Sequence, residues 1–134
     1  MRVVLDTNVL VAAFASRGLC EAVVEICLSC HEIFLSEPIL GELGRHLKGK
    51  LKVPKRQANE ILSLLRQQAT MVEPLEVPAG ACRDSADLAV LGTAAAAVAD
   101  CLVTGGQDLL VLSQFRGVPI LSPRAFHDKL LRPG

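Results

Sequence analysis

The sequence predicts an α/β fold in which helices cover both faces of a parallel sheet of four or five strands. Short apolar runs alternate along the chain with longer segments whose apolar residues recur at helical spacing. Strands and helices that alternate in this way are typical of parallel sheets. The length of 134 residues is that of one domain, and no linker-like or repeated segment interrupts it. We therefore expect a single domain over residues 1–134.

Each element has its own local signal. Strands are expected at residues 2–5, 32–35, 71–73, 101–104 and 118–121, where apolar residues are contiguous. Helices are expected at residues 8–16, 20–30, 38–47, 55–68, 86–99 and 108–115, and a last helix begins at Ser122-Pro123. Arg17-Gly18 separates the first two helices, and Ser36 is expected to cap the third, which has Pro38 in its first turn.

Composition excludes several classes of protein. Hydrophobic residues make up 51% of the chain and charged residues 21%, which is typical of a folded globular protein rather than a disordered one. Aromatic residues amount to 3%, with no Trp or Tyr, which argues against a stacking platform for single-stranded nucleic acid. The uncharged stretch 88–99 is shorter than the ~20 residues of a membrane helix. Because the N-terminus has no long apolar signal region, we expect a cytoplasmic protein without membrane association.

Acidic residues follow several of the expected strands or open the helices after them. Asp6 ends the first strand, Asp84 and Asp87 lie where a loop enters the Ala-rich helix, and Asp108 opens a later helix. Glu42 lies in the helix after the second strand. Each helix-start Asp alone is most simply a cap or a partner of the helix dipole. However, carboxylates gathered at the carboxyl edge of one sheet repel one another unless a hard cation such as Mg²⁺ or Mn²⁺ lies between them.

Five segments of the sequence together resemble the PIN domain family. They are MRVVLDTNVLV at the N-terminus, LSEPILGEL, CRDSADLAVL, ADCLVTGGQDLL and VPILSPRAF. The resemblance covers residues 1–131, and within the family the sequence looks most like the toxin components of bacterial toxin–antitoxin pairs. It implies a three-layer α/β/α sandwich and a metal-dependent ribonuclease that uses Mg²⁺ or Mn²⁺. It also implies an RNA substrate, a small antitoxin partner and a homodimer.

The resemblance assigns roles to individual residues. Asp6, Glu42 and Asp87 match the family's catalytic acids, which also bind metal, and Asp84 matches an accessory acid. Asn8, Ser36 and Thr104 match polar residues that support the acids. One position departs from the pattern, because Gly106 stands where the family usually has a fourth acid. Asp108, two residues later, reaches the site only if the loop bends differently or a water intervenes. The alternative is therefore a catalytically weakened domain that binds RNA or a protein as a regulatory module.

A basic segment accompanies the acids. Residues 45–56 hold six of the 14 Lys and Arg residues and no acid. We expect Arg45, Lys48, Lys50 and Lys52 to bind RNA phosphates, and the alternative is an ordinary solvated connection between helices.

Three other motifs predict different chemistry. Cys27-Leu-Ser-Cys30-His31 has the spacing of a haem-attachment motif or part of a zinc site, although the odd number of five cysteines favours reduced, buried thiols. Gly105-Gly106 is a glycine turn of the kind that binds phosphate, without a complete nucleotide-binding pattern. An acidic pocket that accepts a phosphoryl group on Asp6 is a further alternative.

Overall fold

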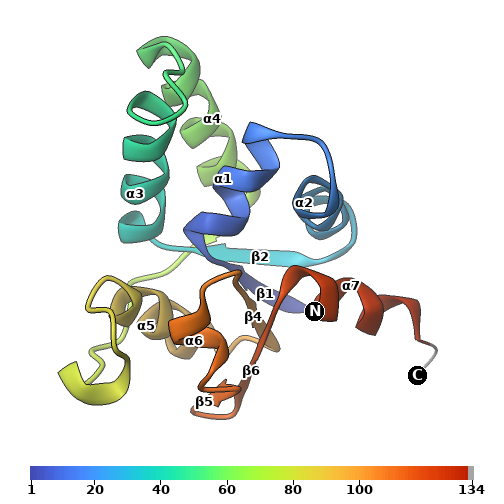
Figure 1. Cartoon of the computed structure of the whole chain (residues 1–134), viewed down its shortest axis with the longest axis vertical. Coiled ribbons are helices and arrows are strands. Elements are labelled where there is room, and N and C mark those ends of the chain that lie inside the picture. The colour runs from blue at the N-terminus through green and yellow to red at the C-terminus, as the bar shows by residue number, and fades with distance from the viewer. Residues whose placement is uncertain (133–134) are drawn as a thin grey trace.

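Parallel strands form the centre of the fold, where the apolar runs of the sequence are buried (Figure 1). The computed structural model describes residues 1–132. The strands are β1 (Arg2–Leu5), β2 (Glu32–Leu35), β3 (Thr70–Met71), β4 (Cys101–Val103), β5 (Gln114–Phe115) and β6 (Val118–Leu121). They form one sheet in the order β3-β2-β1-β4-β6-β5, in which only β5 runs antiparallel to its neighbour. The predicted parallel sheet is thus confirmed, with a short antiparallel strand added at its edge.

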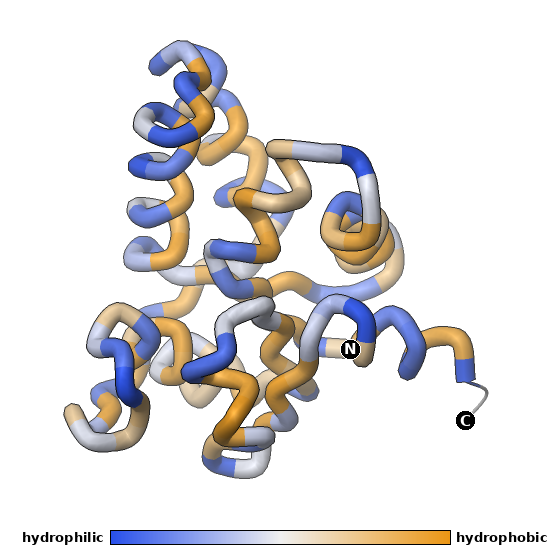
Figure 2. Tube along the Cα trace, in the orientation of Figure 1, coloured by the Kyte–Doolittle hydropathy of each residue, from blue (hydrophilic) through white to orange (hydrophobic). Residues whose placement is uncertain are grey.

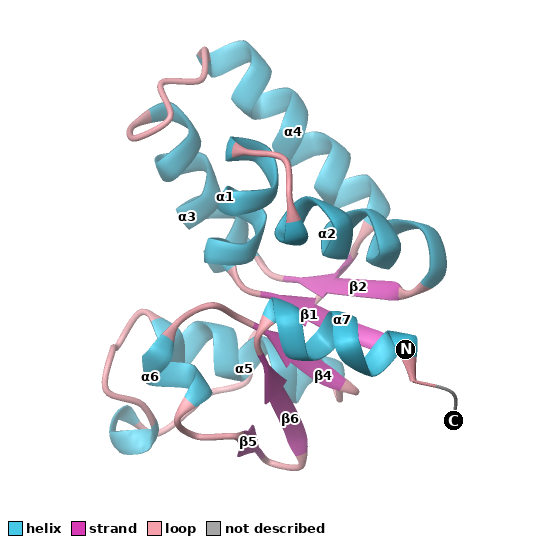
Figure 3. Ribbon diagram, turned by 45° about the vertical axis from the view of Figure 1, so that its right-hand side comes forward, coloured by secondary structure: helices cyan, strands magenta, loops and turns pink. Residues whose placement is uncertain are grey.

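Helices lie on both faces of this sheet. They are α1 (Thr7–Ala15), α2 (Leu19–Cys30), α3 (Glu37–Lys48), α4 (Lys55–Gln68), α5 (Asp87–Ala97), α6 (Gln107–Leu110) and α7 (Pro123–Leu131), with a 3₁₀ turn at Ala79–Ala81. Figure 3 shows α1, α2 and α7 on one side of the strands and α5 and α6 on the other. The α3–α4 hairpin packs against α1 and extends beyond the sheet. This arrangement is the predicted α/β/α sandwich.

The core lies where the amphipathic helices meet the sheet. Val3, Val4 and Leu5 of β1 are completely buried, as a central strand covered on both faces requires. In Figure 2 the hydrophobic residues of α1 to α4 face one another and the sheet, while the hydrophilic residues lie outside. Among residues 1–132 no helix has both the length and the apolar character needed to cross a bilayer.

Strand order determines where a ligand site can form. From β1 the chain proceeds outward to β2 and β3, then returns across β1 to form β4 and β6 on its other side. The direction of winding therefore reverses between the carboxyl ends of β1 and β4, and open α/β sheets bind ligands at such a point. Leu5 pairs with Val103 in register, and the Asp6 amide donates to the Val103 carbonyl at 3.0 Å. The residues after both strands thus lie side by side.

Three predictions of local structure are wrong. The helix expected over residues 108–115 ends at Leu110, because Ser113 and Arg116 have positive φ and the chain turns into the β5–β6 hairpin, where Gly117 has φ +83°. The helix expected to reach residue 99 ends at Ala97, because Val98 is left-handed with φ +46°. Ser36 occupies the N-cap position of α3, but its side chain forms no capping hydrogen bond. The predicted domain end at residue 134 lies outside the described residues.

Candidate metal centre at the carboxyl edge of the sheet

Asp6 is the most firmly held acid of the site. It ends β1, is only 4% exposed and caps α1, with its Oδ1 accepting from the Thr7 amide at 2.7 Å. Its Oδ2 accepts from the Thr104 hydroxyl at 2.8 Å and from the Asn8 Nδ2 at 3.2 Å. Burial raises the pKa of Asp6, and these hydrogen bonds oppose the rise because they favour the carboxylate. The fold therefore positions one carboxylate before any ligand is present.

The turn after β4 belongs to the same network. The Thr104 Oγ1 accepts from the Gly106 amide at 3.0 Å, and the Asn8 Oδ1 accepts from the Gly105 amide at 3.0 Å. Asn8 and Thr104, both predicted as supporting polar residues, thus connect the ends of β1 and β4. A Cβ added at Gly106 would be 3.4 Å from the Asn8 Nδ2 and the Thr104 Oγ1, an ordinary contact distance.

Three further acids gather opposite this network. Asp84, Asp87 and Asp108 each have a carboxylate oxygen within 4.8 Å of the others, a spacing that would allow them to share a cation. Asp84 is on the loop, Asp87 begins α5 as predicted, and Asp108 lies in the first turn of α6. The loop does bend so that Asp108 reaches the acids, although Gly106 offers no carboxylate. An all-oxygen donor set of this kind fits Mg²⁺ or Mn²⁺.

The pKa of Asp87 reflects the repulsion between these neighbouring carboxylates. Partial burial, followed by the negative charges of Asp6, Asp84 and Asp108, raises the pKa of Asp87 to about 6. The group that opposes this rise is the thiol of Cys82, which donates to the Asp87 Oδ2 at 3.8 Å. The three other aspartates therefore all act electrostatically on Asp87, and a cation between them would relieve this repulsion.

Cys82 received no role in the sequence analysis, yet it lies against two of the acids. Its Sγ is buried and also contacts the Asp108 carbonyl at 3.7 Å. Burial raises the pKa of this thiol, so the group is a neutral donor. In the sequence, only its position two residues before Asp84 indicates that Cys82 lies near the acids. The conformation of the loop determines that it contacts Asp87 and Asp108.

Glu42 lies at the rim of the site rather than within the three-acid group. Its side chain is 36% exposed and 3.8 Å from the His46 Nε2, one turn further along α3. The charge of Glu42 raises the pKa of Asp6, which places the two carboxylates within electrostatic reach of each other. The predicted catalytic acids therefore occupy one edge, with Glu42 on the α3 side.

Ser36 has a different environment from the other predicted supporting residues. Its completely buried hydroxyl lies 2.7 Å from the Thr93 Oγ1, and Thr93 donates to the Ala89 carbonyl at 2.7 Å. Because the single Thr93 proton is used in that bond, Ser36 is the donor to Thr93. This hydroxyl pair joins the start of α3 to α5 and includes none of the acids.

The predicted RNA-binding residues follow α3 away from the acids. Arg45 and Lys48 lie in its last turns, and Lys50 and Lys52 lie in the connection to α4; all four are exposed. With a rise of about 1.5 Å per residue, Lys48 is about 9 Å further along the helix axis than Glu42. The basic segment thus extends from the rim of the acidic site to the tip of the α3–α4 hairpin (Figure 1).

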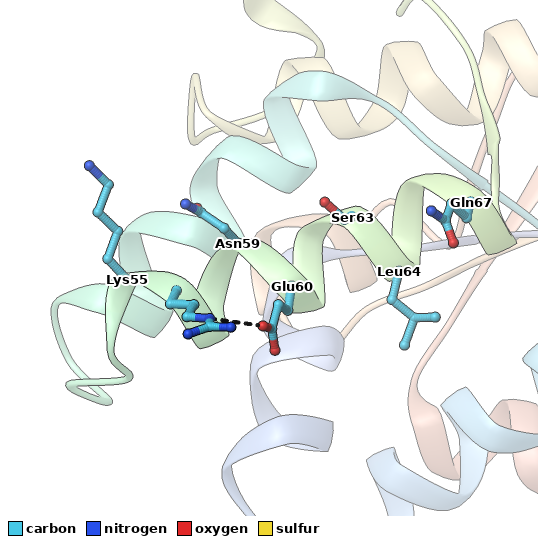
Figure 4. A pocket seen from close by; sticks show the side chains of 7 residues that line it. Lys55, Asn59, Glu60, Ser63, Leu64 and Gln67 are labelled. Carbon is cyan, nitrogen blue, oxygen red and sulfur yellow. Dashed lines mark ion pairs between the residues drawn. The ribbon is translucent and has the colours of Figure 1, made fainter.

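Two other features lie apart from the acids. Figure 4 shows an open hollow along the outer face of α4, where Arg56 and Glu60 form an ion pair at 3.5 Å; all its lining residues come from this one helix.

In the Cys27–His31 motif Cys27 is buried, Cys30 is exposed, and both are free thiols. Within residues 1–132 the three aspartates are the one group of at least three His, Cys, Asp or Glu side chains with metal-binding spacing. The motif therefore does not gather a ligand set in the described structure.

Comparison with known proteins gives a family match and a fold match. A family model described as the PIN domain matches residues 2–108. Similar solved structures include VapBC2 from Rickettsia felis bound to a DNA fragment from its promoter, with 17% identity over 91% of this chain and 98% of that chain and a TM-score of 0.64. Another is VapBC-1 from nontypeable Haemophilus influenzae, with 19% identity over 92% of this chain and 99% of that chain and a TM-score of 0.61. No curated protein matches.

Proposed function

The chain belongs to the PIN domain family, and from this premise we propose that it is a metal-dependent ribonuclease acting as the toxin of a toxin–antitoxin pair. The observation that carries the proposal is the convergence of Asp6, Asp84, Asp87 and Asp108 at the point where the sheet reverses its winding. The reaction is hydrolysis of RNA phosphodiester bonds. The two similar structures are VapBC proteins, which supports the toxin assignment.

The side chains of the site would have different roles in the reaction. Asp6 and Asp87, with Asp84 and Asp108, would hold Mg²⁺ or Mn²⁺, and Glu42 would either join them or orient the attacking water. A bound divalent ion supplies polarisation of the phosphate and activation of a water. Asn8 and Thr104 keep the Asp6 carboxylate in place through hydrogen bonds of 3.2 and 2.8 Å. Ser36 does not take part in this network, because its hydroxyl bonds Thr93.

Gly106 supports a second candidate, a catalytically weakened domain that binds RNA or a protein. The position of Asp108 favours the enzyme instead, because its carboxylate lies within 4.8 Å of Asp84 and Asp87 and replaces the acid absent at residue 106.

The first experiment is cleavage of a mixed-sequence RNA with Mg²⁺ or Mn²⁺. We expect cleavage that EDTA abolishes and that Asp6→Asn reduces at least about 100-fold, since even outer residues of metal sites contribute 10- to 100-fold. Asp128→Asn, an exposed acid on α7, is the matched control and should retain activity. Folded wild-type protein that leaves RNA intact with either metal would favour the binding module.

The basic segment gives a separate test of the RNA substrate. Replacing Lys48, Lys50 and Lys52 together with Gln should lower the dependence of RNA affinity on salt concentration, because each phosphate contact of a single strand contributes about 0.7 to the slope. Fluorescence anisotropy of labelled RNA at several salt concentrations measures this slope. An unchanged slope would assign the segment to an ordinary solvated connection.

Two protein partners complete the proposal. We propose a small antitoxin and a second copy of the chain, with action in the cytoplasm, where RNA substrates are available. The exposed side chains of Phe14, Leu28 and Leu64 line one apolar hollow between α1, α2 and α4, which is suited to a protein contact. Light scattering of the purified protein tests self-association, since a homodimer should have twice the mass of the 14.3 kDa chain.

A further inference from the structure

A pocket of about 300 Å³ lies beside the acidic site, between α3 and the start of α5. Buried Ile39 and Val90 contribute apolar walls, while Glu42 and Ser85 contribute polar groups. This combination of apolar walls and a few polar groups is typical of a small-ligand site.

The pocket adjoins the metal centre through the segment 84–87. Ser85 and Ala86 line the pocket. The residues on either side of them in the chain, Asp84 and Asp87, face Asp108. Glu42 borders the pocket and raises the pKa of Asp6. A nucleotide whose phosphate lies at the acids would therefore have a neighbouring base at this pocket.

Gly41 opens the pocket. It is an exposed glycine in the interior of α3, where glycine costs about 1 kcal/mol relative to alanine. Packing explains Gly44 in the same helix, because a Cβ there would be 3.1 Å from the Leu62 side chain. No such reason applies to Gly41, where a Cβ would meet one atom within 4 Å, the Arg45 guanidinium at 3.7 Å. The missing side chain leaves space in the pocket wall.

Arg45 lies over that space. Side chains of helical residues lean toward the N-terminus, and the Arg45 guanidinium accordingly reaches back along α3 over Gly41. None of the ion pairs among residues 1–132 includes Arg45: Glu37 pairs with Arg66, Glu42 with His46, and Glu60 with Arg56. The guanidinium is thus available to a ligand, with its donors in a planar fork.

The charges around the pocket favour a base over a phosphate. Glu37 and Glu42 border it together with Arg45, and the aspartates lie next to it, so a phosphate would be repelled while a neutral base would not. Guanine presents two acceptors, O6 and N7, to which arginine donates in a bidentate manner. The carboxylate of Glu37, which accepts from Arg66 at 3.0 and 2.8 Å, also borders the pocket and would offer acceptor oxygens to the N–H groups of guanine.

We propose that this pocket binds a guanine base next to the scissile phosphate and that Arg45 determines this specificity. The inference rests on the proposed nuclease function for its place in the reaction, but base binding can be measured without cleavage. The probes are fluorescent heptauridylates that carry G, A, C or U at the central position. Binding is measured in Ca²⁺ in place of Mg²⁺, with the RNA checked for integrity afterwards.

We expect the G-containing RNA to bind about tenfold more tightly than the other three, which is the discrimination that one bidentate contact provides. Arg45→Met should reduce this preference below twofold, and Arg124→Met, an exposed arginine of α7, should leave it unchanged. Gly41→Leu should also remove the preference while the protein stays folded and unfolds at no lower temperature, because leucine favours helix and no packed atom obstructs it.

Equal binding of all four RNAs, a preference for another base, or a guanine preference that survives both Arg45→Met and Gly41→Leu would overturn the assignment. Failure of the nuclease proposal gives a different result. Guanine preference in binding without cleavage in Mg²⁺ or Mn²⁺ would support the pocket and contradict the enzyme.

Discussion

The two halves of the acidic edge hold their carboxylates in opposite ways. On the side of β1 and β4, Asp6 accepts hydrogen bonds from Thr7, Asn8 and Thr104. On the side of the loop, α5 and α6, Asp84, Asp87 and Asp108 face one another within 4.8 Å. There the Asp87 carboxylate receives a weak thiol hydrogen bond from Cys82.

The difference shows how folding and ligand binding share the site. In the first half, that of Asp6, the hydrogen bonds form as the sheet folds. Asp6 is therefore oriented by the same contacts that join β1 to β4. The second half accumulates like charges that destabilise the folded chain until a cation neutralises them. Metal binding should therefore stabilise the second half and have little effect on the first.

Within the second half, the group of Asp84, Asp87 and Asp108, the largest expected effect comes from removing one of the acids. Asp108→Asn should lower Mn²⁺ affinity and RNA cleavage at least about tenfold, because its carboxylate replaces the acid that Gly106 lacks. Adding Gly106→Asp to this variant should restore part of the loss, since a Cβ at residue 106 meets its neighbours at an ordinary 3.4 Å. Calorimetry with Mn²⁺ and the cleavage assay measure the two quantities.

The wild-type background serves as the control for this rescue. Gly106→Asp alone should change activity less than it does in the Asp108→Asn protein, because the wild-type site already has its fourth carboxylate. If Asp108→Asn kept full metal affinity, the second half of the site would consist of Asp84 and Asp87 alone, and the comparison between the halves would fail.

Most of the fold follows from local sequence signals. The apolar runs at β1, β2 and β4 and the amphipathic segments of α3 and α4 were sufficient to predict a parallel sheet covered by helices. The β5–β6 hairpin was not predictable in the same way, because Leu109 to Leu112 have the character of a helix. The chain turns there at Ser113 and Arg116, which have positive φ without being glycines.

In the candidate site, residues at strand ends could be predicted, whereas residues positioned by loops could not. Asp6 could be placed from the sequence because it ends a strand, and Thr104 could be assigned from the family resemblance. The structure adds that the two strands are parallel neighbours. The proximity of Asp108 and Cys82 to Asp87 depends on the path of the loop before α5 and of the turn before α6. Spacing in the sequence does not determine these paths, so the structure was needed to bring these residues together.

The pH dependence of stability tests the repulsion in the second half. The pKa of Asp87 in the folded, metal-free protein is about 6, above its ordinary value of 3.8, so the folded state retains a proton that the unfolded state releases. Stability should be greatest below about pH 4 with respect to this group and fall as the pH rises to 6. We expect a loss on the order of 1 kcal/mol, since solvent screens a half-buried carboxylate.

Urea unfolding in EDTA across this pH range measures the loss. Mg²⁺ or Asp87→Asn should each flatten the profile, because either one removes the unfavourable charge. A metal-free protein whose stability rose between pH 4 and 6 by the same amount with and without Asp87 would contradict the repulsion.

The smallest effect on metal binding is expected at Ser36, which the family resemblance places with the first half of the site but whose hydroxyl bonds Thr93. Ser36→Ala should lower the free energy of unfolding by about 1 kcal/mol, because the buried Thr93 oxygen loses its donor. The stabilisation by Mg²⁺ should stay the same, since no acid loses a partner. Thr93→Ser, which keeps both hydroxyls, is the control. If Ser36→Ala instead weakened Mg²⁺ binding as Asp108→Asn is expected to do, the hydroxyl pair would belong to the acidic site, and the first half would extend through β2 to α5.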